Sequence, residues 1–242
     1  MLKALWCATR HPDLSLAEYA QHWFEVHGQL HLQPGHKLLG YIQHHTLFGS
    51  QERDPRPTHD GASIVWLEST AAYVEALATK AFIDATVDAD AGVRGHMPLL
   101  AQPLPFAFGE ERLIVDGAIR PMMVKAIHVV LRDPDLAEDA FFRHWEDVHG
   151  ALVARLPGLR RYVQNHGREG ADAYDEHGAR PHDGWSEMWF DSAEDFYAAA
   201  ESPEWAAMER DAEEGVAGRP LFDAERSCFV LGRERLLLAP PA

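Results

Sequence analysis

The segment HWFEVHG occupies residues 22–28 and returns as HWEDVHG at residues 144–150. The second copy begins 122 positions after the first (144 minus 22). The matches continue on either side of it, and a Pro-Gly pair at 34–35 recurs at 157–158. A repeat of this length indicates one structural unit that is used twice in the chain.

Each copy predicts the element order β-α-β-β-α-β. Ser15 and Glu18 have the spacing of a capping box, in which each side chain binds the other residue's backbone N–H at a helix start. Asp135 and Glu138 repeat that spacing in the second copy. For the first copy we expect strands at residues 2–9, 38–48, 64–67 and 106–115, and helices at 15–27 and 71–87, by hydrophobic pattern and turn residues. For the second copy we expect strands at 122–131 and 162–166 and around Trp189, a last strand from about 229, and helices at 135–155 and 192–214.

This order is the split βαβ, or ferredoxin-like, plan, so the fold class is α+β. A single unit leaves one face of its antiparallel sheet uncovered, and two such sheets bury that surface when they pack together. We therefore expect a pseudo-dimer within one chain, with a closed or nearly closed barrel. Its parts are a first unit at residues 1–115, a linker at 116–121 and a second unit at 122–242.

Composition narrows the range of partners. Of the 242 residues, 46% are hydrophobic and 25% are charged, which is typical of a soluble globular protein. The formal charge of −16 argues against nucleic acid, and no apolar run approaches the roughly 20 residues of a membrane helix. Cys7 and Cys228 are the two cysteines, and we expect reduced thiols in a cytoplasmic protein. The charge leaves open whether two pseudo-dimers associate further into a homodimer.

The second copy resembles a known family. The pattern HWxxxHG at 144–150, the run LPGLRRY at 156–162 and the run DGWSEMWF at 183–190 resemble the EthD family of the dimeric α+β barrel superfamily. The resemblance implies the fold. It also implies chemistry of the kinds found in that superfamily, which includes cofactor-free isomerases, cyclases and monooxygenases as well as haem-binding proteins. The first copy departs from the pattern, because Ile64 stands where the second has Glu187. We therefore expect the second half alone to be active.

Histidine is the side chain best suited to proton transfer here, since it titrates near neutral pH. His149 is the predicted catalytic base, with His27 as its counterpart in the first copy. Glu187, as a further catalytic residue, and Asp183 are predicted to orient the His149 ring or to stabilise its charged form. The competing interpretation is that His149 caps the negative end of its helix.

The remaining candidates would contact substrate. Trp145 lies four residues before His149 and shares its helix face. His144 lies five before it, about 140° around an α-helix, and so is expected only at the pocket edge. Tyr162 and His166 share one side of a strand, where they would line a pocket or be ordinary strand residues. The other expected contacts are His182, Asp183 and Trp189, with His22 and Trp23 in the first copy.

Several signatures are missing from the sequence: the phosphate-binding loop, the dinucleotide fingerprint and the nucleophile elbow. His27 and His31 have the spacing of two metal ligands, but no third ligand is evident, so no metal is expected. We predict a cofactor-independent isomerase, dehydratase (lyase) or cyclase acting on a small hydrophobic carbonyl, phenolic or polyketide-like compound. The alternatives are a monooxygenase, with haem or without a cofactor, and a non-catalytic carrier of a hydrophobic metabolite.

Overall fold

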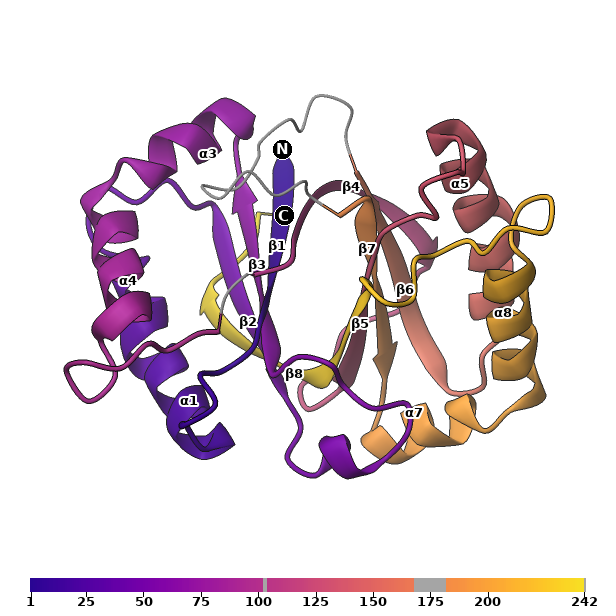
Figure 1. Ribbon diagram of the computed structural model, residues 1–242, viewed down its shortest axis with the longest axis horizontal. Coiled ribbons are helices and arrows are strands. Elements are labelled where there is room, and N and C mark those ends of the chain that lie inside the picture. Colours follow the sequence, from indigo (N-terminus) through magenta and orange to yellow (C-terminus); the bar gives the residue numbers. More distant parts are fainter. Residues whose placement is uncertain (102–103, 168–181, 242) are drawn as a thin grey trace.

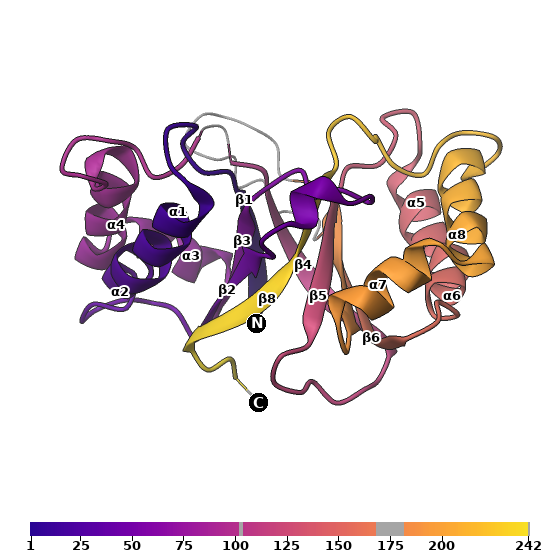
Figure 2. The same ribbon diagram turned by 90° about the horizontal axis from the view of Figure 1, so that it is seen from below.

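The computed structural model describes residues 1–101, 104–167 and 182–241. A barrel of eight strands lies at the centre, and a layer of helices covers it on each side (Figure 1). The view in Figure 2 shows the helices of residues 16–91 on one flank and those of residues 138–214 on the other. No described helix is both long and apolar enough to cross a bilayer. The polar loop expected ahead of His182 lies outside the described residues.

The first unit contains β1 (Leu2–Ala8), α1 (Leu16–His22), η1 (Trp23–His27), α2 (Gly28–Leu30), β2 (Gly40–Thr46), η2 (Ser50–Glu52), β3 (Gly61–Leu67), α3 (Thr70–Leu77), α4 (Lys80–Ala91) and β4 (Phe106–Val115). The second unit contains β5 (Val124–Val130), α5 (Glu138–His144), η3 (Trp145–His149), α6 (Gly150–Val153), β6 (Leu159–His166), β7 (Gly184–Phe190), α7 (Ala193–Ala200), α8 (Pro203–Glu214) and β8 (Cys228–Leu238).

The strands close in the order β1-β3-β2-β8-β5-β7-β6-β4, with antiparallel neighbours throughout. The last strand of each unit joins the other unit: β4 pairs with β6, and β8 pairs with β2. Closure leaves no sheet edge unpaired. The structure confirms the expected α+β fold and the barrel formed by two tandem units.

Alternation along each strand divides the side chains between two environments. Those that point inward include Leu5, Ile64, Ile127 and Trp185, which form one buried cluster. Their outward neighbours pack beneath the helices in separate clusters, two for each unit. Any pocket between a sheet and its helices is therefore separated from the barrel interior by the sheet itself.

Two predictions about helices were wrong. Each second helix was expected to be continuous, but it is broken into two, because Thr79 and Ser202 each cap a new helix start with their side-chain oxygens. Pro203 occupies the first position of α8. The capping box at Ser15 and Glu18 is confirmed, whereas α5 begins after Ala137 with no side-chain cap and Asp135 pairs with Arg219 instead.

Candidate functional site

The repeated HWxxxHG segments each contain one π-helical turn. In the first unit this turn is η1, and the backbone N–H of Gly28 donates to the carbonyl of Trp23, five residues earlier. The wider turn of a π-helix places residues five apart nearly above one another, whereas an α-helix separates them by about 140°. The expectation that the two histidines diverge was therefore wrong, because it assumed α-helical geometry.

One carboxylate binds both histidines. Asp88 Oδ2 lies 3.0 Å from Nδ1 of His27, and Asp88 Oδ1 lies 2.9 Å from Nε2 of His22. Burial acts to raise the pKa of Asp88, but hydrogen bonds and positive charge from His27 and His22 outweigh it and hold the pKa below its usual value.

The second unit repeats the arrangement with Asp211. Its carboxylate oxygens lie 2.9 Å from His149 Nδ1 and 2.9 Å from His144 Nε2. Neither Asp88 nor Asp211 was predicted as a site residue. Their recurrence 123 positions apart (211 minus 88), within otherwise dissimilar helices, was the signal that could have identified them.

The glycine of the motif makes room for a glutamine that supports the π-turn. Gln43 Nε2 donates to the carbonyl of Trp23 at 2.8 Å and to the hydroxyl of Tyr41 at 3.0 Å. A Cβ at Gly28 would lie 2.8 Å from that Gln43 nitrogen. The motif therefore encodes the backbone geometry that brings His22 and His27 onto one aspartate.

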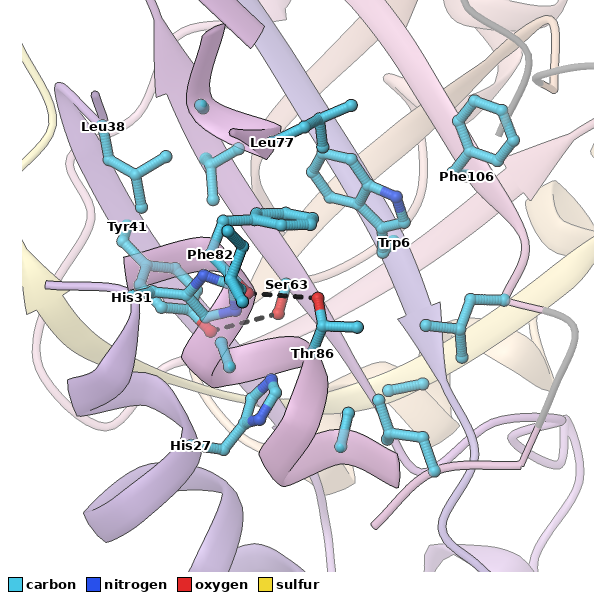
Figure 3. A pocket seen from close by; sticks show the side chains of 18 of the residues that line it. Trp6, His27, His31, Leu38, Tyr41, Ser63, Leu77, Phe82, Thr86 and Phe106 are labelled. Atoms are coloured by element: carbon cyan, nitrogen blue, oxygen red, sulfur yellow. Dashed lines mark hydrogen bonds between the residues drawn. The ribbon is translucent and has the colours of Figure 1, made fainter. Parts of the chain in front are cut away.

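A cavity of about 560 Å³ opens beside this pair in the first unit, between the outer face of its sheet and the helical segments η1, α3 and α4. Figure 3 shows His27 and His31 on one side of the cavity, with Phe82, Trp6 and Phe106 along its wall. Because Nδ1 of His27 is bound to Asp88, Nε2 is the ring nitrogen left for a ligand. The cavity volume lies within the range of sites for small organic molecules.

The polar groups of the cavity wall are few. Tyr41 Oη lies 3.4 Å from Ser63 Oγ, and the ring of His31 stands edge-on to that of Tyr41 at 5.8 Å between centroids. The His31 and His27 rings are 5.1 Å apart. Burial, together with the nearby His27, lowers the pKa of His31 to about 3, so its imidazole is neutral at physiological pH.

In the second unit, larger side chains stand at the corresponding positions. Met188 occupies the position of Val65. Val65 pairs with Ala4 between β1 and β3, and Met188 pairs with Ala126 between β5 and β7. Ala85 lies three residues before Asp88, and Met208 lies three before Asp211. Met188 and Met208 both belong to the packed core of the second unit.

A ring also covers the second histidine. Leu100 and Phe222 occupy equivalent positions in the two units. Leu100 forms an isolated β-bridge with Arg10, and Phe222 forms one with Arg132. The Phe222 ring lies 5.3 Å from that of His149, edge-on. The histidine–aspartate pair is thus present twice, but in the second unit an aromatic side chain packs against the histidine.

Glu187 is not a partner of His149. It points into the barrel, where its oxygens lie 2.6 Å from Lys3 Nζ and 2.7 Å from Lys125 Nζ, and Trp185 Nε1 donates to it at 3.0 Å. Burial acts to raise the pKa of Glu187, but the two lysines outweigh it and lower the pKa far below its usual value. The sheet separates Glu187 from His149, so the prediction that it orients this ring was wrong.

Asp183 also lies elsewhere. Its carboxylate binds the Arg132 side chain and accepts from the Arg132 backbone N–H at 2.9 Å. A Cβ at the adjoining Gly184 would lie 3.1 Å from the ring of Trp145. The Asp-Gly pair therefore anchors a strand end and makes room for the tryptophan, rather than meeting His149 as predicted.

The other predicted contacts are dispersed. His166 stacks on Trp145 with 4.8 Å between ring centroids, and its Nε2 lies 2.8 Å from Gln164. Tyr162 is buried and accepts from the same Gln164 at 2.9 Å. His182 lies 3.0 Å from the Arg226 carbonyl. The last of these contacts, Trp189, faces the barrel interior, 5.0 Å from Lys125 Nζ.

The cavity does not fit haem, the cofactor of the alternative prediction. His27, with an aspartate on Nδ1, resembles an axial ligand. However, the haem propionates would need cationic partners, and the lining formed by the described residues contains no Lys or Arg. Within the described ranges, no group of three His, Cys, Asp or Glu side chains is arranged to hold a metal ion.

Residues 133–217 match the family model of the EthD domain. This segment of the second half is similar to the EthD domain family. The match excludes the first half, where the cavity lies. Within the EthD-matched segment, the histidine–aspartate pair of His149 and Asp211 is the counterpart of His27 and Asp88.

Several solved structures share the fold. An anthrone oxidase-like protein is 15% identical, with 100% of this chain and 96% of that chain covered and a TM-score of 0.62. A "putative monooxygenase" from Fusobacterium nucleatum subsp. nucleatum ATCC 25586 is 8% identical, with 100% and 95% covered and a TM-score of 0.56. An ethyl tert-butyl ether d (ethd) family protein from Bacillus halodurans C-125 is 24% identical over 47% of this chain and 100% of that chain, with a TM-score of 0.37. No curated protein matches. The first two similarities establish the fold alone.

Proposed function

We propose that the protein is an enzyme in which His27 removes a proton from a small, flat and largely apolar substrate. The observation that carries the proposal is the position of His27, which lies at the wall of a cavity of about 560 Å³ and is held through Nδ1 by Asp88. The catalytic base is therefore assigned to the first half, and His149 becomes its covered counterpart.

Asp88 fixes the ring of His27 and stabilises the imidazolium that forms when Nε2 takes a proton. A positioned base of this kind contributes about 10²- to 10⁴-fold to a rate. His22 shares the carboxylate and helps to fix its orientation, because it binds Asp88 at 2.9 Å.

The cavity wall suits an aromatic substrate. Trp6 lies 5.8 Å from Tyr73 and 6.1 Å from Phe108, ring to ring, and Phe82 stands edge-on to His31. Rings of this kind favour stacked or edge-to-face contacts with a planar aromatic ligand. A phenolic or enolisable carbonyl compound would combine such a ring system with a proton acidic enough for a histidine.

Two reactions could follow proton removal. In the first, the proton returns to another atom or a leaving group departs, which gives isomerisation, dehydration or cyclisation. In the second, the carbanion reacts with dioxygen, so that R₂CH₂ and O₂ give R₂C=O and H₂O. The likeness to the anthrone oxidase-like protein supports the second as an alternative.

Anthrone, a planar ketone with an acidic methylene, tests these possibilities. The methylene protons are followed by NMR in D₂O under nitrogen, and oxygen uptake is then followed in air. Enzyme-dependent exchange without oxygen uptake supports acid–base chemistry, and uptake of one O₂ per anthrone supports oxygenation. Tight binding of anthrone with neither proton exchange nor oxygen uptake would indicate a carrier instead of an enzyme.

The cellular setting is part of the same proposal. Cys7 and Cys228 are free and buried, which suits a reducing compartment such as the cytoplasm. One chain supplies all eight strands of the barrel. A second copy of the chain is therefore not needed for the site to form.

A further inference from the structure

His31 is a polar side chain of the cavity that the second unit replaces with an apolar one. It lies four residues after His27 on the same helical segment, and the residue four after His149 is Val153. Val153 packs in the core of the second unit, so this scaffold accommodates an aliphatic side chain at that position. Of the other polar groups on the wall, His27, Tyr41 and Ser63 have identical counterparts in the second unit, whereas Tyr73, Thr86 and Asp90 stand where that unit has Phe196, Glu209 and Glu213.

Within the described part of the chain, no hydrogen bond joins the His31 ring to another group. Its ring contacts are edge-on approaches to His27, Tyr41 and Phe82, at 5.1, 5.8 and 5.7 Å between centroids. Tyr41, in contrast, is engaged by Gln43 at 3.0 Å. His31 therefore offers the cavity a polar group that no protein partner satisfies. Because His31 is half-buried, a ligand or water in the cavity can supply that partner.

We propose that His31 donates a hydrogen bond to the carbonyl oxygen of the substrate and thereby selects a planar enolisable ketone. This inference rests on the proposed function, because it places the acidic C–H of the same molecule at His27. With the two rings 5.1 Å apart, a single ring system reaches both. The N–H of His31 stabilises the enolate oxygen as the C–H bond breaks, and the proton passes to Nε2 of His27.

A neutral imidazole suits this task. It donates one N–H and does not protonate the oxygen outright, and the lowered pKa of His31 keeps it neutral. The nearby carboxylate of Asp88 binds His22 and His27 rather than His31. The two histidines thus differ in role, since one is paired with a carboxylate and the other is not.

The test compares two tricyclic ligands of similar size, anthrone and 9,10-dihydroanthracene, which lacks the oxygen. Dissociation constants are measured under nitrogen by quenching of tryptophan fluorescence. We expect the wild-type protein to prefer anthrone about tenfold, the value of one hydrogen bond. His31→Val, which installs the natural residue of the second unit, should abolish the preference. His31→Gln, which retains a donor, should restore part of it.

An unchanged preference in His31→Val would overturn the inference, as would equal binding of the two ligands by the wild-type protein or binding of neither. Val153→Ala is the matched control and should leave the preference intact. Because this readout is binding, it is independent of turnover. Loss of preference in His31→Val together with unchanged proton exchange in His27→Ala would refute the proposed function and leave the role of His31 standing.

Discussion

The carboxylate of Asp88 lies 3.0 Å from Nδ1 of His27, although the two residues are 61 positions apart in the chain. The contact joins α4 to the π-helical turn η1, and His22 meets the same carboxylate. A second copy of the arrangement is built from Asp211 and His149. The fold therefore places the same pair of groups twice, and the surrounding side chains decide which pair faces a cavity.

Replacing the carboxylate tests its role in positioning. Asp88→Asn keeps the shape of the side chain but removes the charge that stabilises a protonated His27. We expect kcat to fall about 10- to 100-fold, with a smaller change in KM, as for other groups that orient a catalytic histidine. Steady-state kinetics on a confirmed substrate measures this. Asp211→Asn is the control, and an equal loss in that variant would argue that both halves are active.

Side-chain size at the cavity can be exchanged between the halves. Leu100→Phe introduces the ring that packs on His149 in the second unit, and we expect it to cover His27 and weaken ligand binding at least tenfold. The dissociation constant of anthrone measures the effect. The matched variant Phe222→Leu should leave binding by the first half unchanged. Undiminished binding in Leu100→Phe would place the ligand elsewhere.

Glu187 should matter for stability rather than for the chemistry. Glu187→Ala leaves Lys3 and Lys125 buried without the carboxylate between them. Removing one partner of a buried ion pair typically destabilises a protein by about 3–5 kcal/mol. Lys3 keeps Glu111 and Lys125 keeps Glu234, so we expect a loss below that range. Urea unfolding measures the free energy of unfolding, and kcat of the fraction that remains folded should be unchanged. A stable variant with lost activity would return Glu187 to the catalytic machinery.

His166 gives a pH dependence of stability. Burial and the nearby Arg112 lower its pKa to about 4, whereas the unfolded chain has a pKa of about 6.5. Between these values the unfolded state binds one more proton, so stability falls as pH falls, by up to about 1.4 kcal/mol per pH unit. We expect His166→Phe to show a shallower dependence between pH 6.5 and 4.5 in urea unfolding. The same slope in both proteins would contradict this assignment.

Much of the fold could be predicted from the sequence, because the repeat and the alternation of apolar residues report on local structure. The strand at 106–115 and the capping box at Ser15 are examples. The continuous second helices were mispredicted because the caps at Thr79 and Ser202 lie within stretches that read as helical throughout.

The site was harder to predict, because its contacts are long-range. The sequence indicated His27 and His149, but their aspartates lie on a helix 61 or 62 positions away. Glu187 alternates with tryptophans on a strand, and the pattern alone could not say that this face turns into the barrel. The π-turn likewise has no sequence rule that would have placed His22 and His27 on one face.

The most direct measurement of the central claim is proton exchange at the anthrone methylene in D₂O under nitrogen, compared between His27→Ala and His149→Ala. The account predicts that His27→Ala loses at least 100-fold of the enzyme-dependent rate, while His149→Ala keeps it within a factor of two or so, given its place in the covered unit. Full exchange by His27→Ala, or an equal loss in His149→Ala, would contradict the assignment of the base to the first half.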